Sequence, residues 1–251
     1  MKYNKIVVLG CSVSSTTKVH YAWGHYLSAR LGLDYLHFAQ GCSSDKRNFR
    51  LLIQAIQSGE VDENSLVLFQ PTEVTRRELP SHVTDEEYEK HMTDVMFSKE
   101  PGASAILDKT LTGSKVSFFK IDSHTWQPNN TDATVHKQYQ ERPGCLDSMF
   151  DAEMLSVYYY MLEQTCKQKN ITLVTIWDGT RGWLDVLQPH LDVGAIFDHE
   201  LWFQTMNYFT ENERLNVYAL SPPHDTVHFS EAGHIKLADD IHTFLEEKGV
   251  I

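Results

Sequence analysis

The stretch IVVLGCSVSS, residues 6–15, decides how the rest of the chain is interpreted. Four aliphatic residues in succession, closed by Gly10, are typical of a buried β-strand that ends in a turn. Small residues follow this turn, and Ser12 carries the first hydroxyl beyond the strand. This arrangement makes Ser12 a candidate for a reactive serine at the edge of a sheet.

The composition is typical of one large globular domain. The chain has 251 residues, of which 41% are hydrophobic and 22% are charged, and a domain of this size buries a sufficient core without disulfides or metals. Its formal net charge is −12, from 34 acidic and 22 basic residues. Because phosphate backbones require concentrated Lys and Arg, we expect no nucleic-acid partner.

The cysteines and the apolar runs favour a cytoplasmic protein that contacts no membrane. The four cysteines lack CxxC spacing, which fits neither a zinc site nor a disulfide framework. No run approaches the roughly 20 apolar residues that cross a bilayer. Residues 8–11, VLGC, mimic a lipoprotein cleavage site, but the apolar run before this cysteine covers only residues 6–9. A signal peptide needs about 7–15 apolar residues, so a buried strand explains this run better.

Apolar periodicity predicts strands and helices that alternate at both ends of the chain. The expected strands are residues 5–9, 34–38, 65–70, 171–177 and a last one near 216–220. The expected helices are residues 17–31, 47–58, 146–169, a short one after Arg181, and 231–247. This alternation predicts an α/β fold: a three-layer α/β/α sandwich around a central parallel sheet of about five strands.

The middle of the chain is less regular than its ends. Its one strand-like run is residues 115–121. We expect one domain over residues 1–251, with residues 76–150 as an insertion that forms a cap or side wall. Functional sites of parallel sheets form beyond the carboxyl ends of the strands, so the loops there are the places to search.

Ser12 is the first candidate in these loops. A serine hydroxyl becomes a good nucleophile when a neighbouring base takes its proton. Backbone N–H groups must also stabilise the oxyanion that forms on attack, and a turn of small residues supplies them. The alternative interpretation is a serine-rich turn that caps the following helix.

Asp225 and His228 form the second candidate. An acidic residue three positions before a histidine in one loop can orient the imidazole and stabilise its protonated form, as an aspartate does in Ser-His-Asp chemistry. The alternative is a polar loop with one solvated histidine, since the chain has 13 histidines.

Together these segments resemble the SGNH hydrolases, the GDSL-type esterase and lipase superfamily. Gly10-Cys11-Ser12 is similar to the family's Gly-Asp-Ser block, with Cys11 in place of Asp. The resemblance makes Ser12 the nucleophile and its N–H one oxyanion donor. Gly41 matches the glycine of the second block, which supplies another donor. The last block, Asp-x-x-His, matches residues 225–228, so the catalytic residues would be Ser12, Asp225 and His228. The family fold, described as SGNH or flavodoxin-like, agrees with the predicted sandwich.

The third family block, Gly-x-Asn-Asp, is altered in this chain. Residues 70–73 read QPTE, so Thr72 stands where the family has its oxyanion-binding Asn. A threonine hydroxyl can donate one hydrogen bond, and it is shorter than an Asn amide. Thr72 is therefore the expected third member of the oxyanion hole, beside Ser12 and Gly41.

Other residues near these blocks have a less specific pattern. Cys11 is more nucleophilic than serine as an amino-acid type, but a buried apolar cysteine is the preferred interpretation. Asp178 is a second candidate for the acidic member, with poorer spacing than Asp225. Arg76, Arg77 and Glu78 either grip an anionic or sugar substrate or belong to a solvated, charge-paired loop, and we favour the loop.

The resemblance implies a serine esterase that hydrolyses small acyl esters, with acetyl groups on carbohydrate as the expected substrates. It requires no metal and no organic cofactor. Two alternatives stay open: an O-acyltransferase that uses the same site, and a catalytically inactive binding or structural protein with the same fold.

Overall fold

The computed structural model describes residues 2–11, 14–15, 21–39, 43–72, 77–81, 117–121, 148–177, 200–204, 229 and 231–251. Its centre is a five-stranded sheet in which every neighbouring pair of strands is parallel. In spatial order the strands are β2 (Asp34–His37), β1 (Lys5–Leu9), β3 (Ser65–Phe69), β6 (Thr172–Trp177) and β7 (Trp202–Gln204).

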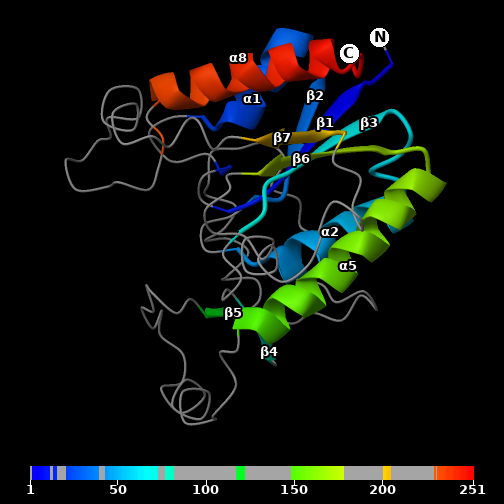
Figure 1. Cartoon of the computed structure of the whole chain (residues 1–251), viewed down its shortest axis with the longest axis vertical. Helices are drawn as coiled ribbons and strands as arrows, with labels where there is room; N and C mark the ends of the chain where they lie inside the picture. The colour runs from blue at the N-terminus through cyan, green and yellow to red at the C-terminus, as the bar shows by residue number, and fades with distance from the viewer. Residues whose placement is uncertain are drawn as a thin grey trace.

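Four helices of the described chain cover the two faces of this sheet (Figure 1). They are α1 (Trp23–Leu31), α2 (Asp45–Ser58), α5 (Ser148–Gln168) and α8 (Glu231–Glu247). Successive side chains of a strand point to opposite faces. Accordingly, Ile6 and Val8 join the core beneath α1 and α8, whereas Val7 and Leu9 join the core beneath α2 and α5. The predicted three-layer α/β/α sandwich is therefore confirmed.

The order of the strands creates a switch point between β1 and β3. The chain passes from β1 to β2 on one side and then crosses to β3 on the other side of β1. The connections that leave the carboxyl ends of β1 and β3 therefore run to opposite faces, and in doubly wound sheets a crevice for ligands lies at this place. The backbones of the two strands stay joined just beyond their ends, because Gln70 N–H donates to the Leu9 carbonyl at 2.9 Å.

Local interactions explain where the helices begin. α2 begins two residues earlier than predicted, because the Ser44 side chain accepts a hydrogen bond from Arg47 N–H at 3.2 Å and caps the helix. The sequence predicts a helix over residues 17–31, and in the described part of this segment, which starts at residue 21, helix α1 begins at Trp23. Ala22 is extended, with φ −81° and ψ 163°, and fully buried. Ala22 is therefore apolar because it is buried in extended backbone before the helix, and not because it belongs to the apolar face of α1.

Two short elements differ from the sequence prediction. The fifth strand of the sheet is β7, only three residues long, and the predicted strand near 216–220 and helix after Arg181 lie outside the described residues. Strand β4 (Arg77–Ser81) pairs antiparallel with β5 (Ser117–Ile121). The interpretation of Arg77 and Glu78 as loop residues was wrong, since both belong to β4, and Arg76 lies outside the described residues. Within the described residues, no helix is long and apolar enough to cross a membrane.

Candidate active site

The described residues beyond β1 and β3 meet at the switch point of the sheet. Cys11 and Ser14 follow β1, and Gln70 and Thr72 follow β3. Of the residues assigned to the oxyanion hole, Thr72 lies in the described part of the chain. Ser12 and Gly41, the other two members assigned to the oxyanion hole, lie outside the described residues. The predicted catalytic residues Asp225 and His228 lie outside them as well, and so does Asp178. Their roles stay predictions, and the described residues on either side of them locate each segment in the fold.

The turn after β1 is closed around Gly10. Ser14 N–H donates to the Cys11 carbonyl at 3.0 Å, and the fully buried Ser14 hydroxyl donates to Gln70 Oε1. A Cβ atom on residue 10 would lie 2.6 Å from Ser14 Oγ and 3.3 Å from Gln70 Cβ. Position 10 must therefore be glycine for Ser14 and Gln70 to meet beside it.

Cys11 lies inside this turn. It is a free thiol with 7% of its surface exposed. This burial confirms the interpretation of Cys11 as a small apolar residue, because a nucleophilic cysteine needs access to its substrate.

Thr72 is held against the start of α2. Its backbone N–H donates to Asp45 Oδ1 at 2.8 Å, and both residues are at most 2% exposed. The Thr72 hydroxyl has no hydrogen-bond partner among the described residues. The one free donor of Thr72 is therefore enclosed, and the backbone around it is tied to α2 and not to the turn after β1.

A buried cation fixes the other described residues at this edge. Arg47, 2% exposed, donates from Nη1 to the Phe38 carbonyl at 2.7 Å and to Ser43 Oγ at 3.1 Å. The Ser43 hydroxyl in turn donates to Asn48 Oδ1 at 3.2 Å. These bonds join the end of β2 to the start of α2, the two described segments on either side of Gly41. Arg47 therefore fixes both flanks of the second predicted block.

On the opposite face, the start of α8 is bonded to the start of α1. His234 accepts a hydrogen bond at Nδ1 from Trp23 N–H at 3.3 Å, and its ring meets the ring of buried Phe229 edge-on, with centroids 5.4 Å apart. Tyr26 donates to Glu231 Oε1 at 2.8 Å. Partial burial raises the pKa of Tyr26 to about 12, and the bond to Glu231 and its charge add to the effect.

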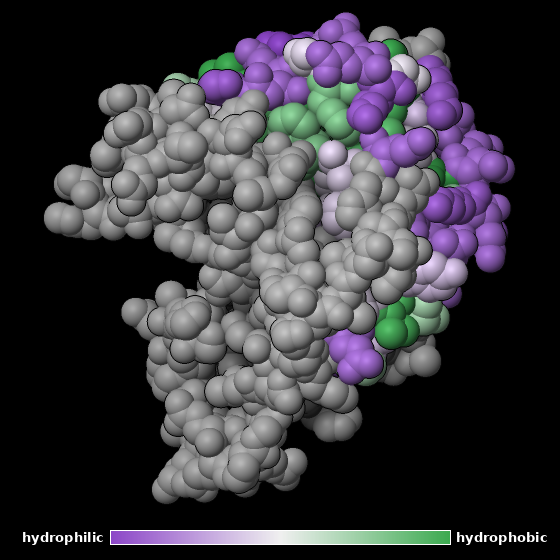
Figure 2. Space-filling model, in the orientation of Figure 1, coloured by the Kyte–Doolittle hydropathy of each residue, from purple (hydrophilic) through white to green (hydrophobic). Residues whose placement is uncertain are grey.

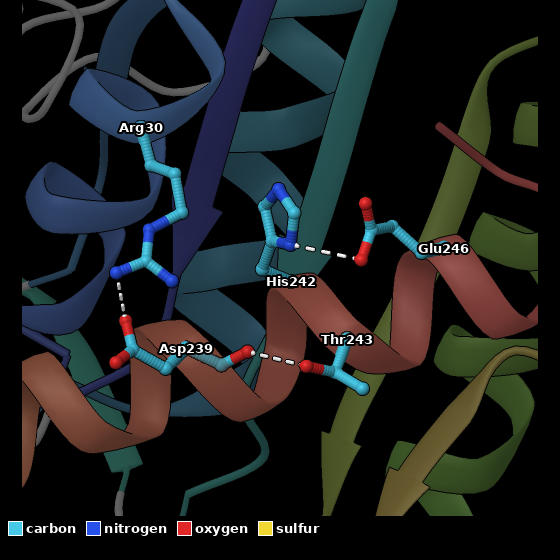
Figure 3. Close-up of polar contacts among 5 residues, drawn as sticks. All are labelled: Arg30, Asp239, His242, Thr243 and Glu246. Carbon is cyan, nitrogen blue, oxygen red and sulfur yellow. Dashed lines mark hydrogen bonds and ion pairs between the residues drawn. The ribbon is translucent and has the colours of Figure 1, made fainter.

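The remaining length of α8 is held by charged and polar contacts (Figure 3). Arg30 of α1 forms an ion pair with Asp239, and the Thr243 hydroxyl donates to the Asp239 carbonyl at 3.1 Å. His242 Nδ1 lies 3.4 Å from Glu246 Oε2, one turn further along the helix. Hydrophilic side chains gather on the outward surface of α8, at the top of the space-filling view (Figure 2). These residues orient α8 and belong to the scaffold.

These contacts place the start of α8 at the carboxyl edge of the sheet. Helix α1 begins at that edge, because it follows β1 and returns the chain to the parallel strand β2. Phe229, directly after the predicted Asp-x-x-His block, shares one hydrophobic core with Trp23 and Val8. The described flanks of the first and last predicted blocks therefore lie at the same edge of the sheet.

Some residues of this edge carried no distinct signal in the sequence. Gln70 was expected to be the last residue of a strand, and Ser14 was one of several serines in a turn. The hydrogen bond between them joins positions 56 residues apart. Local sequence patterns cannot predict a contact over such a separation. Among the described residues, no group of three or more His, Cys, Asp or Glu side chains is placed to hold a metal ion.

Comparison with known proteins does not identify the chain. No protein-family model matches the sequence, and no curated protein matches it.

Proposed function

We propose that this protein is a serine esterase of the SGNH type, with Ser12 as nucleophile, His228 as base and Asp225 as the group that orients His228. One observation carries the proposal: the described residues flanking the Ser12 and His228 segments lie at the same carboxyl edge of a doubly wound sheet, beside its switch point. The segments of Ser12 and His228 are more than two hundred residues apart in the sequence. Their described flanks nevertheless lie at the carboxyl edge of the sheet, where doubly wound folds form their sites.

The chemistry would be acyl transfer in two steps. His228 takes the proton of Ser12 while the serine oxygen bonds to the ester carbonyl carbon, and the carbonyl π electrons move onto oxygen. Backbone N–H groups of Ser12 and Gly41 stabilise this oxyanion, together with a side-chain donor from the loop after β3. The oxyanion then collapses, the bond to the leaving alcohol breaks, and His228 returns its proton to that alcohol. Water repeats the sequence on the acyl-enzyme and releases the acid.

Small acyl esters are the proposed substrates, with acetyl groups on a carbohydrate first among them, and the proposed setting is the cytoplasm. The preference for acetyl esters follows from resemblance to the family and is an associational argument. No nucleic acid takes part in the proposed reaction. If a sugar hydroxyl replaces water in the second step, the same site performs acyl transfer, and product then forms only when an acceptor is supplied.

A fluorophosphonate probe tests the proposal directly, because it modifies a serine that has an activated hydroxyl. We expect the probe to label the parent protein at Ser12 and to label neither Ser12→Ala nor His228→Ala. Ser58→Ala, which changes an exposed serine at the end of α2, is the matched control and should be labelled like the parent.

Hydrolysis of p-nitrophenyl acetate provides a second measurement. The parent should hydrolyse the ester at least 10³-fold faster than Ser12→Ala, in line with the loss of a catalytic serine. Equal background rates for the two proteins, together with absent labelling, would identify an inactive protein with this fold.

A further inference from the structure

Helix α5 carries an apolar stripe on its surface, formed by Val157, Tyr160 and Met161. These side chains are 48%, 46% and 58% exposed, and their spacing makes them neighbours on one side of the helix. Among the described residues, they are three of the five large hydrophobic side chains that are exposed. Scattered apolar residues are normal on a protein surface, whereas contiguous exposed patches are typical of interaction sites.

The apolar stripe lies on the side of α5 that faces away from the sheet. Helix α5 covers the same face of the sheet as α2 (Figure 1). Five buried side chains of α5 join the core on this face: Ala152, Leu155, Tyr159, Leu162 and Cys166. At 3.6 residues per turn, these positions and the apolar stripe lie on opposite sides of the helix. The stripe therefore takes no part in the packing of α5 on the sheet.

The outward face of α5 has the spacing of a helix–helix contact, with opposite charges at its two ends. Its positions follow one another at intervals of four, three, four and three residues: Glu153, Val157, Tyr160, Gln164 and Lys167. This is the heptad spacing of helices that pack side by side. Glu153 and Lys167 are both exposed, and each is seven residues from Tyr160. At 1.5 Å per residue, each charge lies about 10 Å from Tyr160 along the helix axis.

We propose that two copies of this protein pair through α5, with the two helices antiparallel and Tyr160 at the two-fold axis. A two-fold interface brings the same surface of both copies together. In this arrangement Glu153 of each copy is level with Lys167 of the other, so the opposite charges meet twice. Val157 and Met161 of both copies pack around the central Tyr160 rings. This inference is independent of the proposed esterase activity.

The charges favour this partner and this direction. A parallel pair would place Glu153 against Glu153 and Lys167 against Lys167, and like charges repel. A membrane surface attracts helices with Lys and Arg along their polar face, whereas the first turn of α5 is acidic at Asp151. Lys167 Nζ lies 3.9 Å from Glu163 Oε2 of its own helix, and an ammonium group has three donors, so it can also bond to the second copy.

The limited size of this surface predicts a reversible dimer. A contact made by one helix from each copy is small beside the about 1,600 Å² of a standard interface. The net charge of −12 also adds long-range repulsion between copies. Sedimentation velocity of the full-length protein should therefore show monomer at about 2 µM and mostly dimer at about 200 µM.

Removal of the apolar centre tests the surface itself. Tyr160→Gln should raise the dissociation constant of the dimer by about tenfold or more, because it removes a central aromatic anchor from both copies. Met161→Gln changes the most exposed of the three side chains; it should also weaken the dimer, and it serves if Tyr160→Gln does not fold. Ile235→Gln, at an exposed apolar position of α8, is the matched control and should sediment like the parent. Thermal unfolding of dilute samples reports whether each variant is folded.

Reversal of the charges tests the antiparallel direction. Glu153→Lys and Lys167→Glu should each weaken the dimer by about three- to tenfold, because each places like charges together at two points of the interface. The double variant restores opposite charges and should dimerise like the parent. Glu153→Lys lowers the net negative charge, so long-range repulsion cannot account for its weaker dimer. Glu247→Lys, at the exposed end of α8, makes the same charge change on the opposite face of the sheet and should leave the dimer intact.

A parent protein that stays monomeric at about 200 µM would overturn the inference. A parent dimer that folded Tyr160→Gln and Met161→Gln leave unchanged would overturn it as well, because the interface would then lie elsewhere. Single charge reversals that dimerise like the parent would exclude the antiparallel arrangement, as would a double variant that stays as weak as the single ones.

Discussion

Substitution of Gly10 by alanine tests the packing of the turn after β1 without any assumption about function. The added methyl would lie 2.6 Å from Ser14 Oγ and 2.8 Å from Ser14 Cβ, where ordinary contacts are about 3.5–4.0 Å. Ser14 must therefore move by about 1 Å and give up its bond to Gln70. Overpacking costs about 1–3 kcal/mol, and the lost hydrogen bond adds about 1 kcal/mol. We expect Gly10→Ala to lower the free energy of unfolding by about 2–4 kcal/mol.

Urea unfolding at pH 7 measures this loss, and Gly24→Ala is the matched control. A Cβ on residue 24 would lie 2.6 Å from Val8 Cγ2 and 3.1 Å from the Tyr35 ring, so it overpacks the interface of α1 with the sheet and does not touch Ser14 or Gln70. Alanine also gains about 1 kcal/mol of helix propensity over glycine, so Gly24→Ala should lose less stability. A Gly10→Ala protein within about 0.5 kcal/mol of the parent would refute the close approach of Ser14 to Gly10.

Two further predictions concern titratable groups. The backbone N–H of Asn64 holds the pKa of Asp62 below its usual range, so the folded state favours the carboxylate. This stabilisation is present above the unfolded pKa of about 4 and is lost as the pH falls through the lower folded pKa. The stability difference between the parent and Asp62→Ala should therefore shrink between pH 7 and pH 3 in urea unfolding; a constant difference would contradict it. Burial, with a smaller effect of Glu163, raises the pKa of the Cys166 thiol to about 12. Iodoacetamide at pH 8.5 should therefore leave Cys166 unmodified in native protein and modify it in urea, as measured by peptide mass spectrometry; rapid native modification would contradict its burial.

Elements with a strong apolar pattern were predictable from the sequence. Residues 231–247 have an apolar stripe at helical spacing, and α8 has these same bounds. The aliphatic runs of β1 and β3 are buried at every position except Lys5, as expected for strands covered on both faces. The three residues of β7 are too few to show a period. Its place in the sheet is set by pairing with β6, a tertiary contact.

The location of the candidate site could be predicted from the sequence, whereas the contacts of its residues could not. Alternating strands and helices already place a site beyond the carboxyl ends, and the structure brings the flanks of the predicted blocks to that edge. The contacts that hold the residues after β3 could not be predicted from the sequence. The bond of Ser14 to Gln70 and the bond of Thr72 to Asp45 both join segments that are distant in sequence.

The buried polar side chains at this edge argue for preorganisation. Burying a carboxylate and a guanidinium is costly, and well-packed apolar residues in their place are often equally stable or more so. Asp45 and Arg47 are nevertheless almost fully buried at the start of α2, where one fixes the loop after β3 and the other the end of β2. Both bonds restrain backbone segments that flank the predicted oxyanion donors. In the proposed esterase, this restraint would hold those donors still before a substrate arrives, which is the arrangement that stabilises a developing oxyanion best.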